Sequence, residues 1–204
     1  MIVIIDYGMG NLKSVSKALY RIGEETLISS SMKDVENADK LILPGVGHFG
    51  NAVENLKSLG LWEVLNEMVV VRRKPVLGIC LGMQLMARHS EEGNCNGLGW
   101  IDAEVVRFRV SDTVRFKVPH IGWNSAMAIP GFSLFDGLPE SPAFYFVHSY
   151  HMKCNNPEDV VSKTIYDYPF VSSIRKENIF GVQFHPEKSH ETGERLLSNF
   201  LHYK

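Results

Sequence analysis

The chain has 204 residues, of which 45% are hydrophobic and 22% are charged, with a formal net charge of -2. This composition is typical of a globular protein, and the nearly balanced charge without long Lys or Arg runs argues against a nucleic-acid partner. The apolar runs are far shorter than the roughly 20 residues that cross a bilayer, so we expect no membrane segment.

The N-terminus and the cysteines favour the same compartment. Residues 1–6 carry no basic leader ahead of their apolar run, so no secretion signal is expected. The three cysteines lack CxxC spacing, which argues against a disulfide framework and a metal site and favours a reducing cytoplasm. Because the composition does not change along the chain, we predict a single domain over residues 1–204.

Strand and helix patterns alternate through the N-terminal half. Apolar, β-branched runs predict strands at 2–6, 26–28, 40–43 and 75–79, the third of them stopped by Pro44. Helical spacing predicts a helix capped by Asn11 and ended by Gly23, and further helices at 49–59, 61–71 and 83–88. This alternation is typical of a parallel sheet flanked by helices.

Beyond Gly97 the pattern becomes richer in strands. We predict strands at 103–108, 115–118, 144–147 and 160–166, a hairpin of 171–175 with 179–184, and a closing helix at 193–201. The fold class predicted from these elements is α/β.

The segment Gly78-Ile79-Cys80-Leu81-Gly82 lies where a predicted strand meets a helix. Small residues two positions on either side of a nucleophile are typical of a strained elbow that presents its side chain above the sheet. The helix start favours a thiolate, and the Leu81 N–H could donate to a developing oxyanion. On this segment alone, a buried core cysteine is an equally good interpretation.

A candidate base for Cys80 is His185, in the segment Phe184-His185-Pro186-Glu187. Pro186 stiffens the segment, so that Glu187 can turn back and orient the imidazole, as in a catalytic triad. Without the elbow, a surface His-Pro turn would be the better interpretation. His148 has no carboxylate close by in the sequence, so we favour a binding role for it.

Residues 44–50 form a second glycine-rich loop, in which Gly45, Gly47 and Gly50 satisfy GxGxxG. A dinucleotide fingerprint expects this turn after the first strand and an acidic residue at the end of the next strand, whereas here a helical region follows. We therefore expect no dinucleotide cofactor and prefer a loop whose backbone N–H groups face an anionic intermediate.

With these residues in place, the sequence resembles class I glutamine amidotransferases, and among them the glutaminase subunits of imidazole glycerol phosphate synthase. The similarity runs end to end through motifs in the family's order: IIDYGMGNLKSV, LPGVGHFG, GICLGMQLM, VPHIGWN, FYFVHSY, GVQFHPEKS and LLSNF. It implies a flavodoxin-like three-layer sandwich, in which helices flank a central, mostly parallel sheet and a smaller antiparallel sheet accompanies it.

The resemblance also implies roles for individual residues, without a metal or another cofactor. The family's triad falls on Cys80, His185 and Glu187. Its oxyanion hole falls on Val46, Gly47 and Leu81. Its glutamine-binding positions fall on Gly45, Gln84, His148, Ser149 and Tyr150, although Gln84 could also be plain helix surface.

In the family, the ammonia passes to a (β/α)8-barrel cyclase subunit of histidine biosynthesis. No barrel is encoded here, so the resemblance implies a heterodimer with such a cyclase. The family's interface positions fall on Asn11, Tyr145 and Lys188, and a helix cap is an equally good interpretation of Asn11.

Other functions are compatible with the same residues. Close paralogues share the triad and supply ammonia for amidination of an acetamido sugar in surface polysaccharide biosynthesis. A non-catalytic regulatory subunit could retain the fold, but the complete triad argues against it. A cysteine hydrolase acting on peptides would need an extended substrate groove, and the sequence indicates none.

Overall fold

A computed structural model describes residues 1–203 of the chain. The helices are α1 (Leu12–Arg21), α2 (Met32–Asn37), α3 (Phe49–Ser58), α4 (Leu61–Asn66), α5 (Leu81–Gln84) and α6 (His190–His202), with shorter helical segments η1 (Glu67–Val71), η2 (Ser133–Phe135), η3 (Pro157–Asp159) and η4 (Pro186–Lys188). The strands are β1 (Ile2–Ile5), β2 (Thr26–Ser29), β3 (Lys40–Gly45), β4 (Val76–Cys80), β5 (His89–Ser90), β6 (Cys95–Asn96), β7 (Ala103–Arg107), β8 (His120–Ser125), β9 (Met127–Ala128), β10 (Ala143–His148), β11 (Tyr150–Cys154), β12 (Val160–Tyr166), β13 (Tyr168–Lys176) and β14 (Ile179–Val182).

The main sheet is mixed and runs in the order β2-β1-β3-β4-β14-β13-β11-β7-β5-β6. It is parallel from β2 to β14 and antiparallel from β14 through β13 and β11 to β7. β8 and β10 form a separate two-stranded antiparallel sheet. The predicted α/β architecture is therefore confirmed, as is the hairpin, in which Lys176 of β13 pairs with Ile179 of β14.

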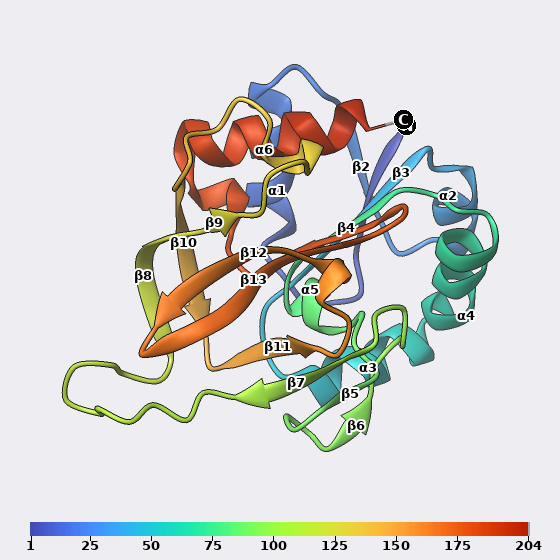
Figure 1. Cartoon of the computed structure of the whole chain (residues 1–204). Helices are drawn as coiled ribbons and strands as arrows, with labels where there is room; N and C mark the ends of the chain where they lie inside the picture. Colours follow the sequence, from blue (N-terminus) through green and yellow to red (C-terminus); the bar gives the residue numbers. More distant parts are fainter. Residues whose placement is uncertain (204) are drawn as a thin grey trace.

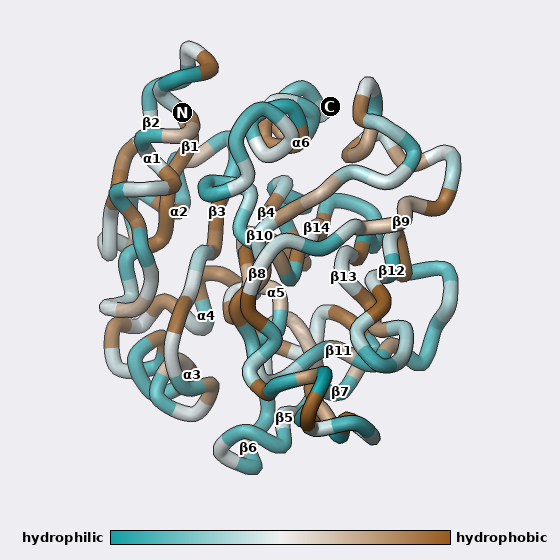
Figure 2. Tube along the Cα trace, turned by 90° about the vertical axis from the view of Figure 1, so that its left-hand side faces the viewer, coloured by the Kyte–Doolittle hydropathy of each residue, from teal (hydrophilic) through white to brown (hydrophobic). Residues whose placement is uncertain are grey.

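Helices cover both faces of the parallel part of the sheet (Figure 1). Successive residues of a strand point to opposite faces, so Val3 and Ile5 of β1 join the apolar cluster that includes α3 and α4, whereas Ile2 and Ile4 join the one that includes α1 and α6. The middle of β3 is hydrophobic at successive residues, as Figure 2 shows, because the strand is covered on both faces. Cys80 stands at the carboxyl end of such a strand, β4.

One strand is longer than the sequence predicted, since β3 continues through Pro44 to Gly45. Pro44 pairs with Ile79 of β4, while the pairing of β3 with β1 on its other side ends at Ile42. Proline has no N–H to donate, so it is tolerated where one neighbouring strand has already ended. The end of β3 therefore stays beside the end of β4.

The predicted helix at 83–88 is wrong. The helix at this place, α5, begins directly after Cys80 and is only four residues long. The carbonyl groups of residues 85–87 instead accept hydrogen bonds from N–H groups of residues 98–101. The segment 98–101 thus occupies the carbonyl groups that would accept hydrogen bonds within a longer helix.

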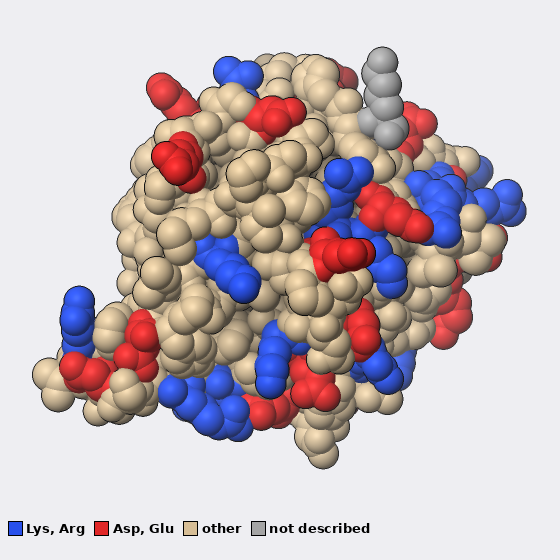
Figure 3. Space-filling view, viewed as in Figure 1, with Lys and Arg blue, Asp and Glu red and all other residues tan. Residues whose placement is uncertain are grey.

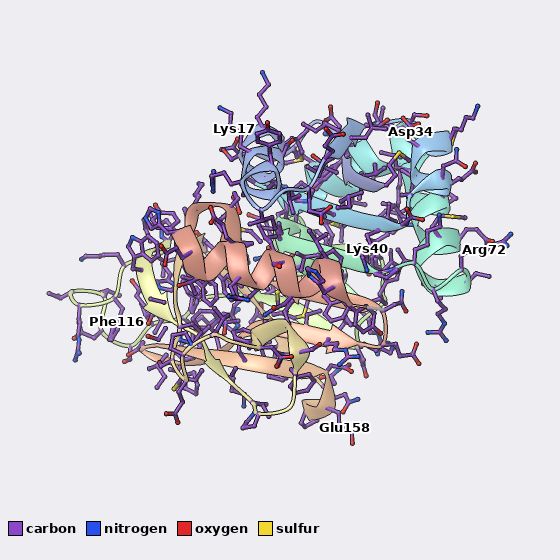
Figure 4. The ribbon with its side chains drawn as sticks, turned by 90° about the horizontal axis from the view of Figure 1, so that it is seen from above. Lys17, Asp34, Lys40, Arg72, Phe116 and Glu158 are labelled. Atoms are coloured by element: carbon purple, nitrogen blue, oxygen red, sulfur yellow. The ribbon has the colours of Figure 1, made fainter. Side chains whose placement is uncertain are left out.

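The predicted strand at 115–118 is also wrong. Asp112 Oδ1 accepts hydrogen bonds from the N–H groups of Val114 and Arg115, both at 3.0 Å. This local turn competes with strand pairing, and the chain enters a strand only at β8. Figure 4 shows Phe116 of this segment at the outer edge of the molecule.

Within residues 1–203, no helix is both long enough and apolar enough to cross a membrane. Lys and Arg side chains are interspersed with Asp and Glu over the face shown in Figure 3. No field of one sign dominates that face, which fits the nearly balanced charge of the sequence.

Candidate active site

Cys80 lies at a tight elbow between β4 and α5. Its φ of 53° and ψ of -109° are uncommon for a residue with a side chain, and such conformations cost on the order of 1–3 kcal/mol. A methyl group on Gly82 would collide with the carbonyl oxygen of Leu43, and one on Gly78 would lie 2.7 Å from that of Gly82. The two glycines therefore let neighbouring backbone approach the elbow, as the sequence predicted.

The sulfur of Cys80 has two polar neighbours. Its Sγ lies 3.6 Å from Gln183 Nε2 and 3.9 Å from the carbonyl oxygen of Val147. Because α5 has only four residues, its aligned dipoles contribute less to thiolate stability than a full helix would. The immediate hydrogen-bond partners of the sulfur therefore matter more than the sequence indicated.

His185 and Glu187 form a buried pair at the end of β14. The Nδ1 atom of His185 lies 2.8 Å from Glu187 Oε1, and the two side chains are 3% and 2% exposed. Burial alone would lower the pKa of His185, but the negative charge of Cys80, the hydrogen bond to Glu187 and the charge of Glu187 raise it from 6.5 to about 10. The imidazole is therefore held in its charged form at neutral pH.

The second ring nitrogen of His185 is free. Among the described residues, its Nε2 is buried and has no hydrogen-bond partner, so Cys80 and His185 share no hydrogen bond in this state. The carboxylate of Glu187 fixes the other nitrogen, Nδ1. The free Nε2 is the group that can exchange a proton with a reacting molecule.

A cavity of about 300 Å³ opens at Cys80. Four of the five expected glutamine-binding residues line it, namely Gln84, His148, Ser149 and Tyr150. The remaining lining residues are Val46, Gly47, Cys80, Leu81, Glu92, Pro119 and Val147. The three expected oxyanion residues thus line the same cavity as Cys80. The volume of this cavity suits a small molecule.

Gly45, the fifth expected glutamine-binding residue, does not line the cavity. It lies against Tyr7, whose buried hydroxyl donates to the Pro44 carbonyl at 2.7 Å. Burial raises the pKa of Tyr7, so this hydroxyl keeps its proton and remains a donor. The stem of the loop is thus anchored, whereas Val46 is 41% exposed and Gly47 adopts a φ of 115°.

Gln84 is buried rather than a surface helix residue. It is 4% exposed, and its Nε2 donates to the Tyr150 carbonyl at 3.0 Å and to Gln183 Oε1 at 2.9 Å. His148 is equally constrained, because its Nδ1 lies 2.8 Å from the same Tyr150 carbonyl and its Nε2 lies 3.0 Å from His120 Nδ1. Gln84 and His148 therefore both hold the Tyr150 backbone at the cavity wall.

The His148 ring is not a candidate base. A carbonyl only accepts hydrogen bonds, so Nδ1 carries the proton and Nε2 accepts from His120. Burial lowers the pKa of His148 well below its usual value, which keeps the ring neutral. His185 is left as the candidate base.

A family model described as glutamine amidotransferase class-I matches residues 3–203. The chain belongs to this family. Imidazole glycerol phosphate synthase subunit HisH 2 of Methanococcus maripaludis is 47% identical over 201 residues, covering 98% of each chain. Subunits of the same synthase from Campylobacter jejuni (HisH 1) and Sulfurimonas denitrificans are 49% and 48% identical, covering 98% and 100% of this chain and 98% and 99% of theirs.

Solved structures support the amidotransferase fold. One named as a crystal structure of glutamine amidotransferase superposes with a TM-score of 0.77 at 20% identity, covering 98% of this chain and 97% of that one. PurLQS from Thermotoga maritima superposes with a TM-score of 0.73 at 15% identity, covering 99% and 97%. At such low identity these likenesses establish the fold of the class I amidotransferase and nothing further.

The candidate site includes residues that the sequence analysis missed. Glu92 reaches the cavity from the segment between β5 and β6, and its Oε2 accepts from the Phe49 N–H at 2.9 Å. No local pattern marks Glu92, because only the folded chain brings this segment to Cys80. Gln183 and His120, by contrast, stand inside the quoted motifs GVQFHPEKS and VPHIGWN, which is the signal that could have found them.

The three expected interface positions lie in different settings. Asn11 caps α1, since its side chain accepts from the Ser14 N–H at 3.4 Å, so the cap interpretation is observed. Lys188 Nζ lies 5.5 Å from the centre of the Tyr145 ring. The Tyr145 carbonyl in turn accepts from the N–H of His185 at 2.9 Å, which links this surface pair to the candidate base.

Proposed function

We propose that this chain is the glutaminase subunit of an imidazole glycerol phosphate synthase, which releases ammonia from glutamine for histidine biosynthesis. The observation that carries this function is a small cavity at a strained Cys80, next to a buried His185–Glu187 pair. Relatives bearing this name are 47–49% identical over nearly the whole chain, which supports the same role here.

The proposed reaction has two steps. The Cys80 thiolate attacks the side-chain amide carbon of glutamine, and N–H groups of Gly47 and Leu81 stabilise the oxyanion. His185 donates its proton to the departing nitrogen, so that ammonia leaves and a thioester remains. Water then gives a proton back to His185, attacks the thioester and releases glutamate.

The cavity walls suggest how glutamine is oriented. The carboxylate of Glu92 supplies negative charge for the α-ammonium group of the substrate. The backbone of residues 149–150, held by Gln84 and His148, supplies polar groups for the rest of the amino-acid moiety. Gly45 packs against Tyr7 outside the cavity, so we assign it to the support of the loop and not to substrate contact.

The partner we propose is a (β/α)8-barrel cyclase subunit in a heterodimer. Ile121 and Trp123 of β8 are 59% and 51% exposed, and the Trp123 ring lies 6.1 Å from that of Tyr145. Exposed aromatic and aliphatic side chains beside the Tyr145–Lys188 pair are typical of protein interfaces. Asn11 remains a proposed member of this interface in addition to its role as a cap.

The first test compares ammonia release by the wild type and Cys80→Ala in the partnered complex. We expect Cys80→Ala to lose at least about a thousand-fold in rate, because the nucleophile is gone. Cys95→Ala and Cys154→Ala are matched controls, since these half-buried free cysteines lie outside the cavity. Equal rates for the wild type and Cys80→Ala would refute the glutaminase function.

The second test identifies the ammonia acceptor. Purified chain is mixed with the histidine-pathway cyclase or with a cyclase-like subunit that amidinates acetamido sugars, each with its own acceptor. We expect only the histidine-pathway pair to raise glutamine turnover. Activation by the sugar-modifying pair alone would keep the glutaminase chemistry and replace the pathway.

A further inference from the structure

Gln183 lies fully buried between Cys80 and Gln84. It follows β14 directly, and because Val182 pairs with Ile79 in the parallel ladder, Gln183 falls beside the next residue of β4, which is Cys80. The Nε2 atom of Gln183 lies 3.6 Å from the sulfur, and its Oε1 lies 2.9 Å from Gln84 Nε2. The side chain therefore bridges the nucleophile and the cavity wall.

The backbone of Tyr150 determines which end of the Gln183 amide meets the sulfur. A carbonyl oxygen only accepts, so the Gln84 amide must turn its nitrogen toward Tyr150 O, at 3.0 Å. The same nitrogen donates to Gln183 Oε1, which leaves the Gln183 nitrogen facing Cys80. This chain of hydrogen bonds delivers an N–H donor to the sulfur.

The two polar groups that contact the Cys80 sulfur favour opposite protonation states. The Val147 carbonyl can only accept, at 3.9 Å, so it favours the thiol. The Gln183 N–H donates and so favours the thiolate, because a donor stabilises the charged acceptor. Since His185 Nε2 makes no hydrogen bond within residues 1–203, Gln183 is the side chain that donates a hydrogen bond to the sulfur in this state.

We propose that Gln183 is a positioning residue that holds the Cys80 sulfur beside the cavity and stabilises its thiolate before glutamine binds. The proposal rests on the proposed function of Cys80 as the nucleophile. Gln183 adds a hydrogen bond to the sulfur, whereas His185 acts on it through its charge alone in the unliganded state. Removing its donor lowers the thiolate fraction while every residue that lines the cavity remains.

Alkylation of Cys80 by iodoacetamide tests the proposal without glutamine turnover, because only the thiolate reacts. Rates are measured across neutral and alkaline pH on the full chain, alone and with the cyclase subunit, and the Cys80 peptide is quantified by mass spectrometry. Gln183→Met keeps the length of the side chain but has no donor. We expect it to react about 3–10-fold more slowly than the wild type at neutral pH, and to approach the wild-type rate at high pH.

A second variant separates hydrogen bonding from packing. Gln183→Glu keeps an acceptor for Gln84 but places negative charge at the sulfur, so we expect it to react more slowly than Gln183→Met. Thr164→Val is the matched control, because Thr164 is equally buried and its hydroxyl has no partner. Its alkylation profile should overlay that of the wild type.

A Gln183→Met profile that overlays the wild type overturns the proposal, even if that variant loses glutaminase activity. If Gln183→Met does not fold, Gln183→Glu reacting as fast as the wild type has the same meaning. Failure of the proposed function is recognised separately, by ammonia release that survives Cys80→Ala. The relative alkylation rates of the wild type, Gln183→Met and Gln183→Glu report the contact of Gln183 with Cys80, whatever the substrate is.

Discussion

At the residue scale, each member of the proposed triad carries a local signal in the sequence. Cys80 stands between glycines at a strand end, and His185 and Glu187 share one short segment. The sulfur contact of Gln183 depends on the register of β14 against β4, which no local pattern encodes. Glu92 has no signal at all, since tertiary folding alone places it at the cavity.

The charge of His185 predicts a pH dependence of stability. Its pKa in the folded chain, about 10, lies above the ordinary value of 6.5, so folding favours the protonated ring. This stabilisation is complete below about pH 6.5 and is lost as the pH rises through about 10. We expect the free energy of unfolding of the wild type to fall across this range relative to His185→Gln, as measured by urea denaturation.

The exposed His202→Gln is the control, and it should follow the wild type at every pH. Cys80→Ala tests the cause, because the charge of Cys80 is the largest effect that raises the His185 pKa. In that variant, the ring should titrate at a lower pH in NMR spectra. An unchanged titration would mean that Glu187 alone holds the proton.

At the element scale, sequence periodicity predicted many of the strands and helices. It missed α2, β8 and β11, and two of its predictions were wrong for tertiary or local reasons. The helix expected at 83–88 ends early because residues 98–101 take its carbonyl acceptors. The strand expected at 115–118 gives way to a turn organised by Asp112. Neither competitor is visible in hydrophobic spacing, which reports only the face that an element buries.

The loop between β3 and α3 gives a prediction at this scale. Tyr7→Phe keeps the buried ring but leaves the Pro44 carbonyl without its donor, which should lower the free energy of unfolding by about 1–3 kcal/mol. Because the anchored stem precedes Val46 and Gly47, we also expect kcat for glutamine to fall by about ten-fold or more, with little change in KM.

Tyr203→Phe is the matched control for Tyr7→Phe. The Tyr203 hydroxyl also donates to a backbone carbonyl, that of Glu177 at 3.3 Å, but the contact is exposed and distant from the cavity. It should change stability by no more than about 0.5 kcal/mol and leave kcat intact. A Tyr7→Phe variant that raises KM and leaves kcat unchanged would show that the loop acts in substrate binding instead.

At the scale of the whole molecule, the parallel part of the sheet separates two apolar clusters and presents the site at the carboxyl ends of its strands. This arrangement fits the single domain that we predict for residues 1–204. The partner face that we propose could be predicted only in part, because β8 was not recognised as a strand. Its exposed residues, Ile121 and Trp123, therefore escaped the sequence analysis.

Trp123 tests where the cyclase subunit binds. Its ring stacks on His190 at 5.3 Å and remains 51% exposed, as expected for an aromatic anchor at an interface. We expect Trp123→Ala to weaken binding of the cyclase by about 2 kcal/mol, or roughly 30-fold in Kd, as measured by calorimetry. Val71→Ala is the control, because Val71 is 64% exposed and belongs to η1, a different element from those that carry Trp123 and Tyr145.

Trp123→Ala should also separate activation by the cyclase from the reactivity of Cys80 in the free chain. Tyr145, next to Trp123, is joined through its carbonyl to the N–H of His185, so we expect a partner bound on this face to affect the proposed base. At cyclase concentrations that saturate only the wild type, the variant should lose activation while alkylation of Cys80 in the free chain is unchanged. If Val71→Ala loses affinity instead, the cyclase binds at the η1 side, and the route from Tyr145 to His185 plays no part in activation.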